Sequence, residues 1–149
     1  MNDGLKTVRT QSEPARTGNA MFALIHAARV LEDRLEKALD SVQLSMPKFS
    51  VLSALSKAGR PQTLGDLALH LSCVRSNMTQ LVDRMEVDGL VRRLSDSSDR
   101  RICLAELTPL GVERAVAGAA LVAAVQAQFE ATLSEEDRVT VGRVTSGLK

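Results

Sequence analysis

The fold of this chain is decided by residues 63–107, which read TLGDLALHLSCVRSNMTQLVDRMEVDGLVRRLSDSSDRRICLAEL. In the first part of this stretch the apolar residues recur with the spacing of one helix face, at Leu64, Leu67, Ala68 and Leu71. The next part repeats that spacing at Met78, Leu81, Val82 and Met85. Two short apolar runs, 90–94 and 102–107, follow and are separated by the polar segment SDSSDRR. The stretch predicts two amphipathic helices and then two strands joined by a charged loop.

Capping residues indicate where these helices begin and end. Thr63 lies three residues before Asp66, which is the spacing of a capping box. The second helix is expected to run from about Arg75 to Val87, and Gly89 ends it. Helix, short turn, helix, strand, loop and strand in this order are typical of a winged helix-turn-helix. We therefore expect a mainly α fold with a small β-ribbon.

The second helix leaves a polar face that suits double-stranded DNA. When its apolar residues turn inward, the outward residues are Arg75, Ser76, Asn77, Thr79, Gln80, Asp83 and Arg84. Arg recognises guanine edges, Asn and Gln recognise adenine, and Ser and Thr hydroxyls bind phosphate oxygens. The alternative is a solvated helix face with a surface charge network. The charged ribbon that follows directly favours DNA over this alternative.

The loop between the strands places two adjacent arginines at the tip of a hairpin. We expect Arg101 to enter the minor groove and Arg100 to lie on a phosphate. Asp99 is two residues from Arg101 and is expected to orient a guanidinium before DNA arrives. The residues predicted to bind DNA are therefore Arg75, Ser76, Asn77, Thr79, Gln80, Arg84, Asp99, Arg100 and Arg101.

Further helices are expected on both sides of this unit. Residues 1–17 are polar without a sustained period, and we interpret them as a flexible tail. A long amphipathic helix begins at about Met21. The later helices are expected to begin at hydroxyl caps, namely Ser45, Thr108 and Ser134. The uncharged run 115–129 is too short to span a bilayer, so we expect a helix buried in a bundle or a dimer.

The composition excludes several classes of function. The chain has 149 residues, a net charge of +1 and two histidines. It has neither Tyr nor Trp, which argues against base stacking on single-stranded nucleic acid. It shows no Gly-rich phosphate loop, nucleophile elbow or zinc-binding helix. His70 and Cys73 are spaced for a metal but are only two ligands. We therefore expect no catalytic residue, cofactor or metal, a reducing cytoplasmic location and no membrane partner.

Taken in order, these motifs resemble those of the MarR family of bacterial transcription regulators over residues 20–149. The matching segments are SNMTQLVDRME (76–86), DGLVRR (88–93) and DSSDRRICLAELTPLG (96–111). The last segment resembles the wing signature of the family through Asp99, Arg101 and the pair Leu107 and Thr108. The resemblance implies a homodimer that binds a pseudo-palindromic operator, usually as a repressor, and releases it when a small ligand or an oxidant arrives.

The resemblance also implies a domain organisation. Residues 18–149 are expected to form one MarR-like domain. Its winged helix-turn-helix covers about residues 45–107, and its dimerisation helices cover about 20–43 and 109–149. Ligands of such proteins enter a cleft between the first helix and the DNA-binding part. Phe22, His26 and Arg29 are candidates there for a small anionic or aromatic effector, although an ordinary histidine and a surface arginine explain them as well.

Two features depart from the family pattern. The family places a polar capping residue where this chain has Val74, so the second helix of the motif could begin at Ser72 or at Arg75. The oxidant-sensing branch carries a cysteine in or near the first helix, and this chain has none there. Two alternatives stay open: a winged helix that binds proteins rather than DNA, and a redox-sensing regulator that uses Cys73. Buried structural thiols are the simpler interpretation of Cys73 and Cys103.

Overall fold

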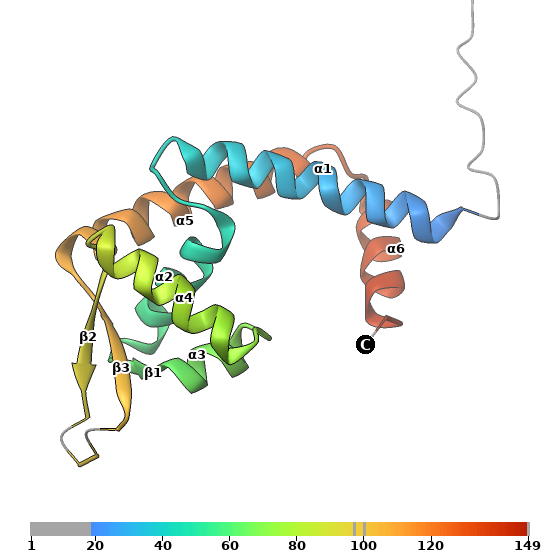
Figure 1. The fold of residues 1–149 in the computed structure, drawn as a ribbon. Coiled ribbons are helices and arrows are strands. Elements are labelled where there is room, and N and C mark those ends of the chain that lie inside the picture. The colour runs from blue at the N-terminus through green and yellow to red at the C-terminus, as the bar shows by residue number, and fades with distance from the viewer. Residues whose placement is uncertain (1–18, 97, 100, 149) are drawn as a thin grey trace, which may run out of the picture.

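The computed structural model describes residues 19–96, 98, 99 and 101–148, so the proposed tail at 1–17 lies outside the described residues. Its elements are α1 (Ala20–Asp40), α2 (Met46–Ala58), β1 (Gln62–Thr63), α3 (Leu64–His70), α4 (Arg75–Val87), β2 (Val91–Ser95), β3 (Cys103–Leu107), α5 (Pro109–Glu130) and α6 (Glu135–Ser146). The strands form an antiparallel sheet in the order β1, β3, β2. The expected fold, mainly α with a small β-ribbon, is confirmed (Figure 1).

Hydroxyl caps begin most of the helices where the sequence predicts them. The Thr63 hydroxyl accepts a hydrogen bond from the main-chain amide of Asp66 at 3.0 Å and so starts α3. Ser134 and Asp137 form a reciprocal capping box at the start of α6. Ser45 takes the N-cap position of α2 without a side-chain bond to the helix. These caps satisfy amides that a helix leaves unpaired in its first turn, which explains why local sequence locates the helix starts.

A third strand was not predicted. Gln62 and Thr63 form β1 and pair with Ala105 and Leu104 of β3. A strand of two residues has no alternating pattern that a sequence could reveal. Its pairing anchors the start of α3 on the ribbon, and thereby fixes the position of the helix-turn-helix relative to the strands.

One hydrophobic core holds residues 46–107 together, and we call this part the winged lobe. Its fully buried side chains come from α2, α3, α4 and β2, namely Val51, Leu52, Leu67, Met78, Val82, Met85 and Val91. Leu39, near the end of α1, is also fully buried against this core. Because one face of α4 is completely inserted in the core, its opposite face is held rigidly toward the solvent.

The remaining helices form an extended arm that leaves the winged lobe (Figure 1). We call α1, the part of α5 beyond Gly118, and α6 the arm; α1 packs along α5. Apolar side chains of the arm are exposed in this single chain, among them Met21, Phe22, Leu24, Ile25, Val139 and Val141.

Helix α5 is the one helix in the described part of the chain that is long and apolar enough to cross a membrane. Only 17% of its apolar window is buried. A single chain therefore leaves most of α5 exposed, and the burial of this helix in a dimer stays a prediction. Its first half nevertheless packs against the winged lobe, because Gly111, Ala115 and Gly118 are buried there. The rest of α5 has too few neighbours within one chain to cover it.

Candidate nucleic-acid interface

The candidate interface is built on α4, whose first helical residue is Arg75. Val74 is the N-cap: its backbone is extended, and its carbonyl accepts the first helical hydrogen bond from Met78 at 3.0 Å. The start at Arg75 decides between the two registers that the sequence left open. Residues 78, 81, 82 and 85 are all buried, so the inward face of α4 is the predicted one.

Most of the predicted outward side chains of α4 are accessible. Those of Arg75, Ser76, Asn77, Gln80, Asp83 and Arg84 are exposed. Thr79 differs because it is half-buried and its hydroxyl donates to the carbonyl of Arg75 at 3.1 Å. The hydroxyl of Thr79 therefore has a partner within its own helix, whereas the side chains of Asn77 and Gln80 are exposed to solvent.

An arginine of β2 that the sequence did not single out connects the wing to α4. The Arg93 guanidinium forms an ion pair with Asp83 at 2.5 Å and donates to the Thr79 carbonyl at 3.3 Å. The main-chain amide of Arg93 donates to Glu86 at 3.1 Å. Asp83 is therefore held by the wing. The alternation of a strand is the signal that could have found this contact, because Arg92 and Arg93 point to opposite faces of β2.

The loop of the wing is organised by two carboxylates. Asp96 accepts hydrogen bonds from the hydroxyl and the main-chain amide of Ser98 and from the amide of Asp99. The Ser98 hydroxyl and these amides hold the pKa of Asp96 below its ordinary value. Asp99 accepts from the main-chain amide of Arg101 at 2.9 Å. It thus fixes the backbone beside Arg101, and the role of Asp99 in orienting a guanidinium stays a prediction. Arg100 lies outside the described residues.

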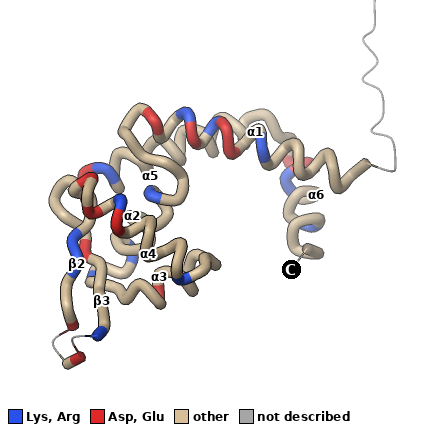
Figure 2. The backbone as a smooth tube through the Cα atoms, in the orientation of Figure 1, with Lys and Arg blue, Asp and Glu red and all other residues tan. Residues whose placement is uncertain are grey.

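The structure brings the helix and the wing together around one hollow. This hollow has a volume of about 440 Å³. It is lined by residues of the α3 start, α4 and the wing, namely Thr63, Leu64, Gly65, Arg75, Thr79, Arg93, Arg101, Ile102 and Cys103. Three arginines from separate elements thus surround a concave surface. Figure 2 shows cationic positions along β2 and at the tip end of β3. Because Arg93 is paired with Asp83, Arg75 and Arg101 are the arginines of this hollow that are suited to phosphates, since guanidinium groups bind phosphate oxygens in a bidentate manner.

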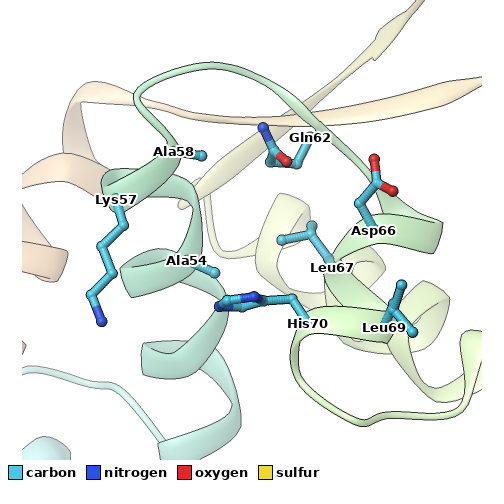
Figure 3. Close-up of a pocket in the computed structure, with 8 residues that line it drawn as sticks. All are labelled: Ala54, Lys57, Ala58, Gln62, Asp66, Leu67, Leu69 and His70. Atoms are coloured by element: carbon cyan, nitrogen blue, oxygen red, sulfur yellow. The ribbon is translucent and has the colours of Figure 1, made fainter.

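The predicted effector residues lie on the arm. Phe22, His26 and Arg29 are exposed on the first half of α1, and every described residue from 19 to 30 is exposed with them. The structure brings these three side chains to no cleft against the winged lobe within the chain. A cavity of about 470 Å³ instead lies between α2 and α3 (Figure 3). There His70 points from α3 toward Ala54 of α2.

The two cysteines are free and half-buried, and both pack against the core. The Cys73 thiol lies 3.5 Å from the carbonyl of Val74. Packing of this kind agrees with structural thiols. Within the described ranges, no three or more His, Cys, Asp or Glu side chains are grouped as a metal site would need.

Comparisons with known proteins agree with this geometry. Residues 44–103 match the model of the MarR family. AbsC, a MarR family transcriptional regulator from Streptomyces coelicolor, is 31% identical and superposes with a TM-score of 0.77 over 87% of this chain and 88% of its own. The transcriptional repressor CouR, solved with a 23-mer DNA duplex, shares the fold at 24% identity and a TM-score of 0.78, over 91% of this chain and 98% of its own.

Among curated proteins, the transcriptional activatory protein BadR of Rhodopseudomonas palustris is 36% identical over 92 residues. This match covers 60% of the chain and about half of BadR, 53% of its length. BadR is described as a transcriptional activator, whereas another relative, IacR of Pseudomonas putida, is described as a transcriptional repressor. The winged lobe, the matching family model and the agreement with AbsC over 88% of its chain lead to one conclusion: this chain belongs to the MarR family.

Proposed function

We propose that this protein is a sequence-specific transcription regulator that binds double-stranded DNA and acts as a ligand-responsive repressor rather than as an enzyme. The observation that carries the proposal is the accessible polar face of α4 beside a hollow with three arginines. Arg75, Asn77 and Gln80 would read base edges, while Arg101 would enter the minor groove. Ser76, Arg84 and Arg100 extend the contacts to phosphates. A regulator of this kind acts in the bacterial cytoplasm, where its operator is.

We propose further that two copies bind together. The arm exposes apolar side chains on α1 and α6, including Phe22 at 63% and Val139 at 64% exposure, and Val116 of the adjoining α5 is 66% exposed. Contiguous exposed apolar surface of this kind favours association. In this proposal the helices at about 20–43 and 109–149 form the dimer, and the winged helix-turn-helix at about 45–107 binds DNA. Sedimentation at micromolar concentration should give a dimer; a stable folded monomer would argue against it.

The test of DNA binding is to select bound duplexes from a random pool and to sequence them. A two-fold dimer should select a pseudo-palindrome whose half-sites are about one helical turn, roughly 10 bp, apart. Inserting five base pairs between the half-sites should abolish tight binding, because one half-site then faces the opposite side of the duplex. Gln80→Ala should change the selected bases. A protein-binding winged helix would select no duplex.

We infer that a small anionic or aromatic effector regulates this binding. The supporting observation is the cavity between α2 and α3, whose apolar lining carries Lys57 and His70. Its volume lies in the range that small-molecule sites occupy, about 300–1,000 Å³. Benzoate, which is an aromatic anion, should lower the affinity of the protein for its operator. Lys57→Ala should abolish the response if the effector enters this cavity, and Arg29→Ala should abolish it if the α1 residues bind it in the dimer.

A further inference from the structure

The residue that precedes the recognition helix is apolar and accessible. Val74 exposes 66% of its surface, although it lies between Cys73, which packs on the core, and the first residue of α4. The backbone of Val74 is extended rather than helical, and its side chain makes no hydrogen bond to the amides of the first turn of α4. The three residues after it, Arg75, Ser76 and Asn77, are also exposed. Val74 is therefore continuous with the polar face proposed to contact DNA.

The chemistry of the major groove limits what an exposed valine could contact there. In a helix-turn-helix the first turn of the recognition helix lies closest to the base edges. Those edges display hydrogen-bond donors and acceptors, for which Val74 has no partner atom. The one apolar group among them is the C5 methyl of thymine. Phosphates are equally unsuited to valine, since they take charged or hydrogen-bonding partners.

We propose that Val74 contacts the C5 methyl group of one thymine in each half-site and so selects thymine at that position. This inference rests on the proposed function, because it requires that α4 enters the major groove. Specificity at this base comes from burying methyl groups against each other. It therefore differs in kind from the amide contacts of Asn77 and Gln80. The same position should reject cytosine, which lacks the methyl group.

The experiment removes the methyl group from each partner in turn. Each thymine of the selected operator is replaced singly by deoxyuridine, which keeps the base pair and lacks the methyl. The affinity is then measured by fluorescence anisotropy. At one thymine per half-site the parent protein should lose about fourfold, the factor that corresponds to one buried methyl-sized group. Val74→Ala alters both protomers of the dimer, so it should lose about fourfold per half-site, roughly 16-fold in all, on the thymine operator and show no further loss on the deoxyuridine operator.

Two further variants separate this contact from other effects. Val87→Ala changes the same residue type at the far end of α4, where Val87 is 88% exposed, and should keep the full response to deoxyuridine. Val74→Ser provides a capping hydroxyl, so it should fold at least as stably as the parent while losing the response. If Val74→Ala and deoxyuridine act additively at every thymine, or no thymine shows the response, the inference is overturned. A protein that binds no selected duplex refutes the proposed function itself, and this result appears before any deoxyuridine is introduced.

Discussion

Replacing Arg93 by methionine should disconnect the wing from the recognition helix. The substitution keeps an unbranched apolar side chain of similar length but removes the ion pair with Asp83 and the hydrogen bond to the Thr79 carbonyl. The main-chain bond from residue 93 to Glu86 stays possible. Helix and wing would then be joined only through their shared core and this one amide.

The magnitude follows from the exposure of the partners. The side chain of Arg93 is 29% exposed and that of Asp83 is 51% exposed, so solvent screens the pair and limits it to at most about 1 kcal/mol. A hydrogen bond from the guanidinium to a main-chain carbonyl adds about 1 kcal/mol. Arg93→Met should therefore lower the free energy of unfolding by about 2 kcal/mol, or the melting temperature by roughly 4–8 °C for a chain of this size.

Arg93→Met should also weaken DNA binding. A displaced wing moves Arg101 away from the duplex, so we expect operator affinity to fall about tenfold. The slope of log affinity against log salt should also fall by about one per half-site. Urea denaturation and anisotropy titrations at several salt concentrations measure the two quantities. Asp83→Asn should reproduce part of both losses, because it removes the other half of the same ion pair.

Arg92→Met is the matched control. Arg92 is the neighbouring residue on β2, faces the other side of the strand and pairs with Glu106 across the ribbon. Its side chain is 64% exposed, so its loss should cost well under about 1 kcal/mol and leave the salt dependence unchanged. The reasoning is refuted if the two methionine variants behave alike. It is also refuted if Asp83→Asn strengthens DNA binding, since Arg93 would then be a phosphate contact that Asp83 weakens.

Three other predictions concern the interface and its support. Asn77→Ala should relax base preference at one or two positions per half-site by about 1–3 kcal/mol, whereas Arg101→Ala should weaken binding most on sites with A·T-rich flanks, whose minor groove is narrow; identical profiles in a binding selection would contradict this division. Gly111→Ala should destabilise the protein by at least about 2 kcal/mol in urea, because the new methyl would lie 2.0 Å from the main-chain oxygen of Leu90. Asp96 has a lowered pKa, so the bonds it accepts are complete above its unfolded pKa of about 3.9 and are lost as the pH falls through its folded pKa. Loop amides should then exchange faster in acid, and Asp96→Asn should remove this pH dependence.

The sequence alone determined the features that depend on neighbouring residues. Helix starts at Thr63 and Ser134 follow from a hydroxyl and a nearby amide within one turn, so four residues contain the whole signal. The inward face of α4 follows in the same way, because its apolar residues repeat with the helical period and only one face can enter a core. The polar face that we propose as the DNA interface is the complement of that pattern.

The tertiary structure decided what depends on residues distant in the chain. The partner of Arg93 lies ten residues away on another element, and β1 needed β3, more than forty residues later, to become a strand. Asp99 accepts the main-chain amide of Arg101, a bond that depends on how the whole loop folds. The exposure of α5 depends on how much apolar surface the rest of one chain can cover. Local periodicity cannot supply this quantity, because the same apolar helix is expected in a monomer core and in a dimer.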